Sequence, residues 1–426
     1  MKHRQIITRL KDGSIQFNNP FSGTESWYTP GRRHRPFHTE KRRHGISLDK
    51  KRCDDYCDFC PANYEKTTPE KSRIEQQSGK MVLLHEPTTD HVFSTTAEVR
   101  RIGNLYEIIP WQYWKMNYGA ELSPKQKAHQ QAYMDSARGR AHIHSVLEIK
   151  RRLISKHRTD KSFDNSSLFE MSEAFFGGAH ELIIPRRHFI DDAKHSHQLC
   201  ATGSLSPQEH YDYFRLTLYA VQDIHANNPF VKFVCVYTNW LRDAGASFEH
   251  LHRQVLGFDR FGNTIENCMS LAKENPIIFQ DYVDYIAGDQ RLVLAQNQGT
   301  ISFVDVGHPF STISIFAQNN GIDPLAVLSE SHRHMSDMVH AVHSCFAPQD
   351  AVNEEWYYKP RAVEVEIPWF ILIKWRNHRH AGIESIANLY PDDYNPFALR
   401  DQLVTKLKRL KREGKIAEMR VGDDCV

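Results

Sequence analysis

Two histidines and a glutamine stand at alternate positions in the run HLHRQ at 250–254, shortly after the turn GAS at 245–247. In an extended strand alternate side chains lie on one face, so we expect His250, His252 and Gln254 to point the same way. The N–H groups of a glycine turn can bind anionic oxygen, and an imidazole can attack phosphorus. The pattern therefore predicts a phosphate-handling site. The alternative is a half-exposed strand whose wet face happens to carry polar residues.

A pair of cysteines with metal-ligand spacing lies near the start of the chain. Cys57 and Cys60 are separated by two residues, and Cys53 precedes them. A redox pair would follow a strand and open a helix, whereas Pro61 and Asn63 continue an irregular segment, so we favour a metal site. Eight cysteines in 426 residues are too sparse for a disulfide scaffold. We expect inert thiols at the remaining positions, which are Cys200, Cys235, Cys268, Cys345 and Cys425.

Composition limits the classes of partner. Hydrophobic residues make up 40% and charged residues 25% of the chain, as in ordinary soluble proteins. Lys and Arg number 54 against 52 Asp and Glu, so overall charge gives no reason to expect a nucleic-acid or membrane partner. No apolar run reaches membrane-spanning length, and the basic first residues are not followed by the apolar core of a signal peptide. We expect a cytoplasmic protein.

A helix and two strands are expected around the histidine run. The segment SPQE at 206–209 is a capping box, and apolar residues then recur on one helical face as far as Ile224. Strands at 230–237 and 250–258 follow, joined by a loop over 239–247. The candidate residues therefore lie on a strand and on the loop before it.

The order helix, strand, loop, strand recurs downstream. A helix is predicted from Asp323 to Val342, and strands follow at 354–358 and 369–375. The similar spacing indicates duplication of the fold, with a boundary near 265–300. The sequence also predicts strands at 104–110 and 180–185, a helix at 123–160 with Ser123 as N-cap, and a basic closing helix at 397–416.

Several separate segments share a pattern with one known family. Asn239 and the runs 245–247 and 250–254 resemble its Asn, Gly, Ser and His-x-His-x-Gln pattern. CDFCPANYEKTTPE at 57–70 resembles its zinc half-site, and GGAHELIIPRRH at 177–188 resembles the strand that delivers another zinc histidine. On these motifs the chain resembles the galactose-1-phosphate uridylyltransferase (GalT)-like branch of the histidine-triad (HIT) superfamily.

Two further segments extend the resemblance to residues 50–400. NLYEIIPWQYW at 104–114 resembles the strand lining the nucleotide base and ribose, which places Trp111 against the substrate. The run from 369 to 403 resembles the closing strand and helix of related sugar-nucleotide phosphorylases. The chain is more similar to an actinobacterial-type set of these proteins than to the uridylyltransferases.

The resemblance implies an α+β fold. Two HIT-like half-barrel domains, each an antiparallel sheet with packed helices, would arise by duplication, and such half-barrels commonly pair into a shared sheet, which is compatible with a homodimer. The expected parts are an irregular basic arm at 1–50, a catalytic domain with the zinc site at 51–265, a second domain at 266–400 and a helix and tail at 401–426.

The resemblance also implies a structural zinc ion. Its ligands would be two thiolates and two imidazoles, which form a closed tetrahedral site that cannot activate water: Cys57, Cys60, His188 and His250. Cys53 is an alternative ligand. The pair His378 and His380 is a weaker candidate for a second metal, because it lies beyond the predicted strand.

In this reading His252 is the nucleophile. Its second ring nitrogen would donate to a backbone carbonyl of the turn, which leaves a lone pair for phosphorus. Gln254 would donate to a non-bridging oxygen, and Ser247 with the amides near Gly245 and Ala246 would face phosphate. Arg253 should face away from the site. Asn239 would brace the turn or bind substrate.

Three functions remain open from sequence. The first is transfer of a nucleoside monophosphate between a nucleotide-sugar and a sugar 1-phosphate through a nucleotidyl-His252 intermediate. The second is a phosphorylase or hydrolase of a nucleotide-sugar or dinucleoside polyphosphate that uses the same histidine. The third is a non-catalytic zinc-stapled protein that binds RNA through the basic run at 31–43.

Overall fold

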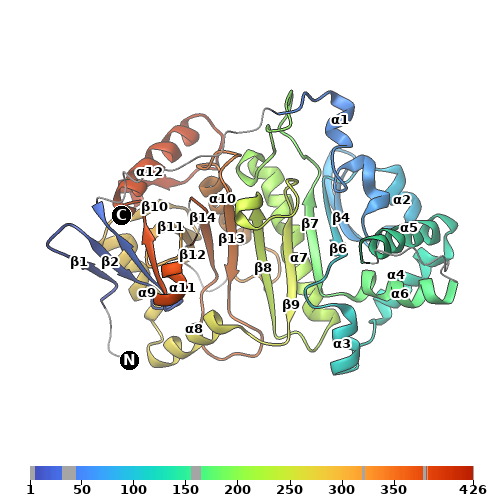
Figure 1. Ribbon diagram of the computed structural model, residues 1–426, viewed down its shortest axis with the longest axis horizontal. Helices are drawn as coiled ribbons and strands as arrows, with labels where there is room; N and C mark the ends of the chain where they lie inside the picture. Colours follow the sequence, from blue (N-terminus) through green and yellow to red (C-terminus); the bar gives the residue numbers. More distant parts are fainter. Residues whose placement is uncertain are drawn as a thin grey trace.

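One continuous sheet forms the centre of the molecule. The computed structural model describes residues 5–30, 45–154, 165–318, 322–377, 380 and 382–425. Twelve strands follow one another in the order β16-β10-β11-β12-β14-β13-β8-β9-β7-β6-β4-β5, and the sheet crosses the whole molecule (Figure 1). Neighbouring strands are antiparallel, as for β8 with β9 and β13 with β14.

The first half of the chain supplies six neighbouring strands. They are β4 (Glu70–Gln77), β5 (Lys80–His85), β6 (Val99–Gly103), β7 (His180–Pro185), β8 (Phe233–Trp240) and β9 (Arg253–Phe258). The helices of this half are α1 (Lys50–Asp54), α2 (Thr89–Ser94), α3 (Trp111–Tyr118), α4 (Pro124–Asp135), α5 (Ala137–Ile154), α6 (Asn165–Gly177) and α7 (Pro207–Asn227).

The second half supplies the other six strands. They are β10 (Val293–Gln296), β11 (Thr300–Asp305), β12 (Ser311–Ala317), β13 (Val352–Tyr357), β14 (Phe370–Trp375) and β16 (Arg420–Val421). The helices here are α8 (Asn263–Glu274), α9 (Ile278–Val283), α10 (Glu330–His343), α11 (Gly382–Ala387) and α12 (Pro396–Arg412), with a π-helix at Asp284–Asp289.

The two halves repeat one order of elements and meet in the middle of the sheet. In each half a long helix, α7 or α10, precedes two adjacent strands, β8–β9 or β13–β14. The inner strands β8 and β13 pair with each other, with Tyr237 opposite Glu355. The predicted α+β fold of two related antiparallel halves is confirmed, and the shared sheet forms within one chain.

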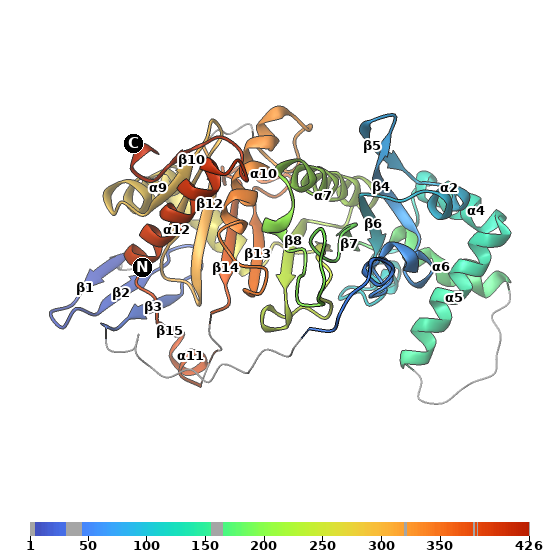
Figure 2. The ribbon, with the colours of Figure 1, turned by 90° about the horizontal axis from the view of Figure 1, so that it is seen from above.

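Helices α7 and α10 lie side by side on one face of the sheet (Figure 2). The capping box of Ser206 and Glu209 starts α7 as predicted, and Pro207 takes the first helical position. Phe214 and Val221 of this helix are fully buried against the strands, together with Met335 and Val339 of α10. The opposite face of the sheet in the first half is left for the candidate site.

The N-terminal segment is not the irregular arm that we expected. Strands β1 (Ile7–Arg9), β2 (Ile15–Asn18) and β3 (Glu25–Tyr28) form a meander, and β3 pairs in parallel with β15 (Leu389–Asp392) from the end of the chain. Alternate residues such as Phe17 and Tyr28 are buried, which stabilises this small sheet. The basic run at 31–43 lies outside the described residues.

Some predicted boundaries shift. The strand expected at 104–110 instead ends at Gly103, because Pro110 serves as the N-cap of α3. The helix expected at 123–160 is divided at Ser136 into α4 and α5, although Ser123 caps it as predicted. Within the described ranges, no helix combines the length and apolar content that a bilayer crossing needs.

Candidate functional site

Two cysteines and two histidines meet at one edge of the first half. Cys57 and Cys60 flank a turn before a short 3-10 helix, His188 follows β7, and His250 precedes β9. One ligand atom of each residue lies within 4.8 Å of the others. Elements more than a hundred residues apart are therefore joined at this point.

The donor set fits a tetrahedral zinc ion. A tetrahedron with Zn–S bonds of about 2.3 Å has an S–S edge of about 3.8 Å. The sulfurs of Cys57 and Cys60 are 3.8 Å apart, and Cys57 Sγ lies 3.3 Å from His188 Nδ1 and 3.5 Å from His250 Nδ1. Both imidazoles present the same ring nitrogen. The arrangement is that of a closed metal site, compatible with the predicted zinc.

Neighbouring groups set the ligand chemistry of the cluster. His250 Nε2 lies 2.8 Å from the carbonyl of Pro185, so it donates its proton there and leaves Nδ1 as a ligand. The sulfur atoms of Cys57 and Cys60 lie within hydrogen-bonding distance, and this contact lowers the pKa of Cys60 and raises the pKa of Cys57. The pKa of Cys60 is thus shifted toward the thiolate, the form that binds metals.

Other metal candidates do not join the cluster. Cys53 contributes its backbone carbonyl, 3.7 Å from Cys60 Sγ, and is not among the grouped ligands. His380 stacks on Phe310 with ring centroids 4.4 Å apart. His378 lies outside the described residues, and the described part of the chain groups no second set of this kind.

His252 has one ring nitrogen fixed and the other free. Its Nδ1 lies 2.8 Å from the carbonyl oxygen of His250 and donates to it. Burial lowers the pKa of His252 below its ordinary value, so the ring is neutral at pH 7. The ring lines a cavity of about 310 Å³, and because Nδ1 carries the proton, the lone pair of the neutral ring is on Nε2. This is the tautomer that the sequence reading required.

Gln254 is held with its amide nitrogen toward the same cavity. Tyr237 Oη donates to Gln254 Oε1 at 2.9 Å. His180 Nδ1 accepts from the Ile108 amide at 3.0 Å, so its Nε2 carries the proton and donates to the same Oε1 at 3.0 Å. With its oxygen occupied by two donors, Gln254 presents Nε2 to the cavity that it lines with His252.

The turn before these residues departs from expectation in one respect. Gly245 and Ser247 line the cavity, as predicted. The amides of Gly245 and Ala246, however, donate within the turn to the carbonyls of Arg242 and Leu241 at 2.9 and 3.1 Å. These two N–H groups are therefore not free to bind phosphate. Ser247 is exposed, which leaves its hydroxyl available to a substrate.

The rest of the cavity is lined by both apolar and polar residues. Ile102, Leu105 and Leu182 supply aliphatic side chains, and Thr67, Thr68 and Asn104 supply hydrogen-bonding groups. Phe59 and Phe248 also line it, with ring centroids 4.6 Å apart. This mixed lining matches a nucleotide, which has an apolar planar base and a polar phosphate chain.

The cavity is not lined by four residues that we expected on the site face or at the turn: Trp111, Asn239, Ala246 and His250. Trp111 is the first residue of α3 rather than part of a strand, and its buried indole donates from Nε1 to Glu173 at 3.1 Å. Trp111 is therefore a packing residue, contrary to its expected contact with the nucleotide. Asn239 stands behind the turn instead of lining the cavity. His250 lies with Cys57, Cys60 and His188 instead. It precedes the first residue of β9, so its side chain does not follow the alternation of faces along that strand.

Arg253 faces away from the cavity, as predicted. It is fully buried on the helix-covered face, where its Nη2 lies 2.7 Å from Glu354 Oε1. Glu354 belongs to β13, so this ion pair joins the two halves behind the candidate site. Thr217 of α7 accepts a second hydrogen bond from the guanidinium at 3.1 Å.

Sequence reasoning missed the two residues that orient Gln254. Tyr237 precedes Asn239 by two positions in a predicted strand, so alternation could have placed it on the site face. His180 stands in a segment that we had assigned only to zinc delivery. Its approach to Gln254 depends on the register of β7 against β9, with Leu182 opposite Gln254, which no local pattern encodes.

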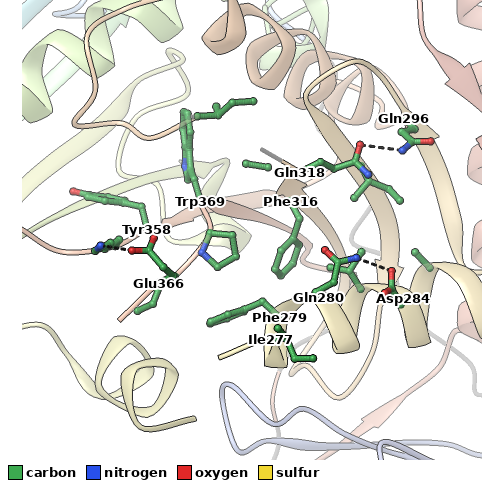
Figure 3. Close-up of a pocket in the computed structure, with 18 of the residues that line it drawn as sticks. Ile277, Phe279, Gln280, Asp284, Gln296, Phe316, Gln318, Tyr358, Glu366 and Trp369 are labelled. Atoms are coloured by element: carbon green, nitrogen blue, oxygen red, sulfur yellow. Dashed lines mark hydrogen bonds and ion pairs between the residues drawn. The ribbon is translucent and has the colours of Figure 1, made fainter. Parts of the chain in front are cut away.

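A second cavity lies elsewhere among the described residues, in the second half. It measures about 680 Å³ and is walled by Phe279, Phe316 and Trp369, with Gln280 and Asp284 on one rim (Figure 3). Its lining carries three carboxylates, Asp284, Asp323 and Glu366, and the ammonium of Lys359, which pairs with Glu366 at 2.7 Å. This acidic lining repels phosphate, so the smaller cavity beside His252 is the candidate nucleotide site.

Comparison with known proteins agrees with this architecture. The family model described as Domain of unknown function (DUF4921) matches residues 10–426. No curated protein is similar to the chain in sequence. An ADP-glucose phosphorylase from Arabidopsis thaliana, solved with bound ADP-glucose, is 14% identical, with a TM-score of 0.58 over 92% of this chain and 98% of that chain.

A GalT-like protein from the same plant is 15% identical, with a TM-score of 0.55 over 91% of this chain and 97% of that one. At these identities the likeness concerns the fold alone. It confirms the GalT-like fold that the motifs predicted.

Proposed function

The chain belongs to the DUF4921 family, and from the geometry above we propose that it transfers a nucleoside monophosphate through a covalent bond to His252. One observation carries this proposal. The proton of His252 is held on Nδ1 by the His250 carbonyl, and the free Nε2 shares a cavity with the oriented amide of Gln254. A neutral imidazole beside a fixed donor suits attack on a phosphorus atom.

The reaction has two displacement steps. In the first, His252 Nε2 forms a bond to the α-phosphorus of a nucleotide-sugar, and the bond from phosphorus to the departing sugar 1-phosphate breaks. In the second, an oxygen of an incoming phosphate attacks the same phosphorus, and the N–P bond breaks. The Nδ1 proton stays on the ring throughout, so the imidazole is regenerated neutral.

The neighbouring groups serve the transferred phosphoryl group. Gln254 Nε2 donates to a non-bridging oxygen, and the Ser247 hydroxyl donates to the outgoing or incoming phosphate. The aliphatic side chains of Ile102 and Leu182 receive the base, and Asn104 lies where it can bond a ribose or base edge. Substrate thus binds with its phosphates toward the turn.

The metal cluster has a structural role in this proposal. A zinc ion would be held by Cys57, Cys60, His188 and His250, and it would supply a structural cross-link between these segments. The carbonyl of His250 accepts the hydrogen bond from Nδ1–H of His252 and so sets its tautomer. The candidate ligand His250 and the nucleophile are therefore only two residues apart.

Two acceptors are consistent with the chemistry. A sugar 1-phosphate as acceptor makes the protein a hexose-1-phosphate uridylyltransferase-like nucleotidyltransferase. Inorganic phosphate as acceptor makes it a nucleotide-sugar phosphorylase, and the similar fold of the plant phosphorylase solved with ADP-glucose supports this second candidate.

An exchange assay separates these candidates. The protein is incubated with UDP-, ADP- and GDP-glucose together with either isotope-labelled glucose 1-phosphate or inorganic phosphate. Label entering the nucleotide-sugar from glucose 1-phosphate establishes reversible transfer, and a nucleoside diphosphate formed only when phosphate is supplied establishes phosphorolysis. Neither product with any donor, from folded and zinc-loaded protein, would refute both.

A further inference from the structure

One asparagine of the second half reaches the turn beside the candidate site. Asn353 of β13 stands opposite Asn239 of β8. Its Nδ2 donates to Asn239 Oδ1 at 2.8 Å and to the carbonyl of Ala244 at 2.9 Å. Asn353 is buried, with 7% of its surface exposed, so these bonds form away from competing water.

An arginine fixes which way this amide points. Arg376, just beyond β14, donates from Nη1 to Asn353 Oδ1 at 2.9 Å. Because a guanidinium carries only donors, the oxygen of Asn353 must face Arg376 and its nitrogen must face Asn239. Asn239 then has its own oxygen occupied and turns its Nδ2 toward the turn. That nitrogen lies 3.8 Å from the point where a side chain on Gly245 would begin.

The turn held in this way is under backbone strain. Leu241 has φ of 69° and ψ of 163°, a conformation that is almost restricted to glycine. Gly245 also has a positive φ, of 90°. Such conformations persist only where the surroundings enforce them, and here Asn353 supplies a side-chain bond to Ala244 from the other half of the molecule.

We infer that Asn353 and Arg376 are positioning residues for the turn at 241–247, through which the second half of the molecule holds the turn that carries Ser247 beside the candidate site. By donating to Asn239 Oδ1, Asn353 orients the Asn239 amide so that its Nδ2 faces the turn that carries Gly245 and Ser247. The two residues touch no reacting atom. The inference deepens the proposed function and rests on it for its kinetic readout.

Replacing the amide by a carboxylate tests the inference. In Asn353→Asp the donor to Asn239 is lost, so the Asn239 amide rotates to donate to the new carboxylate and presents its oxygen to the turn. We expect the rate at which the protein acquires a nucleoside monophosphate in a single turnover to fall about 100-fold, as misplaced groups produce. The matched control is Asn263→Asp, an exposed position at the start of α8 in the same half, and it should label at the wild-type rate.

A double-mutant cycle separates positioning from general damage. If Asn353 acts through Asn239, both changes remove the same group, Asn239 Nδ2, from the turn. The labelling rate of the double variant Asn239→Ala/Asn353→Asp should then lie within about threefold of the rate of the slower single variant. Multiplied effects would instead show that Asn353 only braces the sheet, and would overturn the inference. Should Asn353→Asp fail to fold, Arg376→Met removes the orienting donor without adding a charge, and we expect at least a tenfold loss.

Nucleotide binding distinguishes this inference from the proposed function. ADP, UDP and GDP are titrated into wild type and into Asn353→Asp by calorimetry. If wild type binds a diphosphate but is never labelled, the proposed function fails, while a tenfold or greater weakening in the variant still supports positioning. Equal affinity and equal labelling in both proteins would overturn the inference alone. Wild type that neither binds nor labels would overturn both.

Discussion

At the scale of single residues, the site depends on proton placement. His252 and Gln254 can each be held in two orientations, and in both cases a hydrogen bond to the far atom selects one. The His250 carbonyl accepts a hydrogen bond from Nδ1–H of His252, and Tyr237 and His180 both donate hydrogen bonds to the side-chain oxygen of Gln254. A lone pair and an N–H group therefore face one cavity before any substrate arrives.

The contribution of the Gln254 amide to the rate of nucleotidyl transfer can be measured. We expect Gln254→Leu to lower the single-turnover labelling rate about 10²–10³-fold, or about 2.7–4 kcal/mol of barrier, because the variant loses one donor to the transferred group. Tyr237→Phe removes one of the two groups that hold the amide and should cost less than tenfold. A Gln254→Leu protein that labels normally would remove this residue from the chemistry.

Residue types were easier to predict than residue contacts. The spacing pattern together with the family resemblance singled out His252, Gln254 and Ser247, and the structure brings all three to one cavity. The prediction that the Gly245 and Ala246 amides bind phosphate was wrong, because both amides donate inside the turn, and those hydrogen bonds depend on the unusual backbone conformation of Leu241. The contact of His180 with Gln254 was not predicted, because it depends on the register of β7 against β9.

At the scale of elements, the metal cluster ties an irregular segment to two strands. Residues 57 and 60 lie before β4, whereas His188 and His250 adjoin β7 and β9. Without the cross-link the segment is held by few regular hydrogen bonds. A metal ion bound by these four residues would contribute folding free energy and would hold His250 in place.

Metal removal tests this role. We expect wild type to contain one zinc ion per chain, as a single cluster implies, and Cys57→Ser to lose it and unfold at a lower temperature. Cys53→Ser is the matched control and should keep its zinc, because Cys53 lies outside the ligand group. Elemental analysis with thermal unfolding measures both. Zinc retained in Cys57→Ser but lost in Cys53→Ser would reverse the ligand assignment.

A buried ion pair joins elements of the two halves. Glu354 accepts from Arg253 and from Trp356 Nε1, each at 2.7 Å, and from His343 Nε2 at 2.7 Å. We expect Glu354→Gln to lower the free energy of unfolding by about 3–5 kcal/mol, because Arg253 is left buried without a counter-charge.

Denaturant unfolding measures this loss, with Lys127→Ala as control. The surface pair of Lys127 and Glu121 is mostly exposed, with 57% and 78% of the side chains accessible, so its loss should cost less than about 1 kcal/mol. Equal losses of unfolding free energy in the two variants would show that the buried ion pair stabilises the protein no more than the surface pair does.

Element prediction succeeded where local signals agreed. Helix α7 begins at its predicted capping box, and β7 matches the expected 180–185. The strand expected at 104–110 was wrong because Pro110, taken as a strand terminator, caps a helix. The N-terminal meander was missed since its partner strand, β15, lies far away in sequence.

At the scale of the whole molecule, duplication has left two unequal halves. Both repeat the order of helix and strands, but β14, the counterpart of β9 in that order, begins with Phe370 and Ile371. Phe370 stacks with Phe316 and Tyr357, at centroid distances of 4.8 and 5.0 Å. The second half thus supports the sheet and the turn, while the first half carries the candidate chemistry.

The joined sheet predicts that the halves stay together after a cut. A protease site inserted between β9 and α8, at residues 259–262, gives two fragments that share the β8–β13 pairing and the Arg253–Glu354 ion pair. We expect them to co-elute on native gel filtration and to separate only in denaturant. Separation under native conditions would show that the halves are independent.

The central claim is a covalent nucleotidyl-His252 intermediate, and intact-protein mass spectrometry tests it most directly. Wild type, His252→Ala and Gln254→Leu are each exposed to UDP-, ADP- and GDP-sugars with no acceptor present. We predict that wild type gains the mass of one nucleoside monophosphate from at least one donor, that acid removes it, and that His252→Ala gains nothing while remaining folded and zinc-bound. Wild type that gains no mass from any donor, or an equal gain in His252→Ala, would contradict the account.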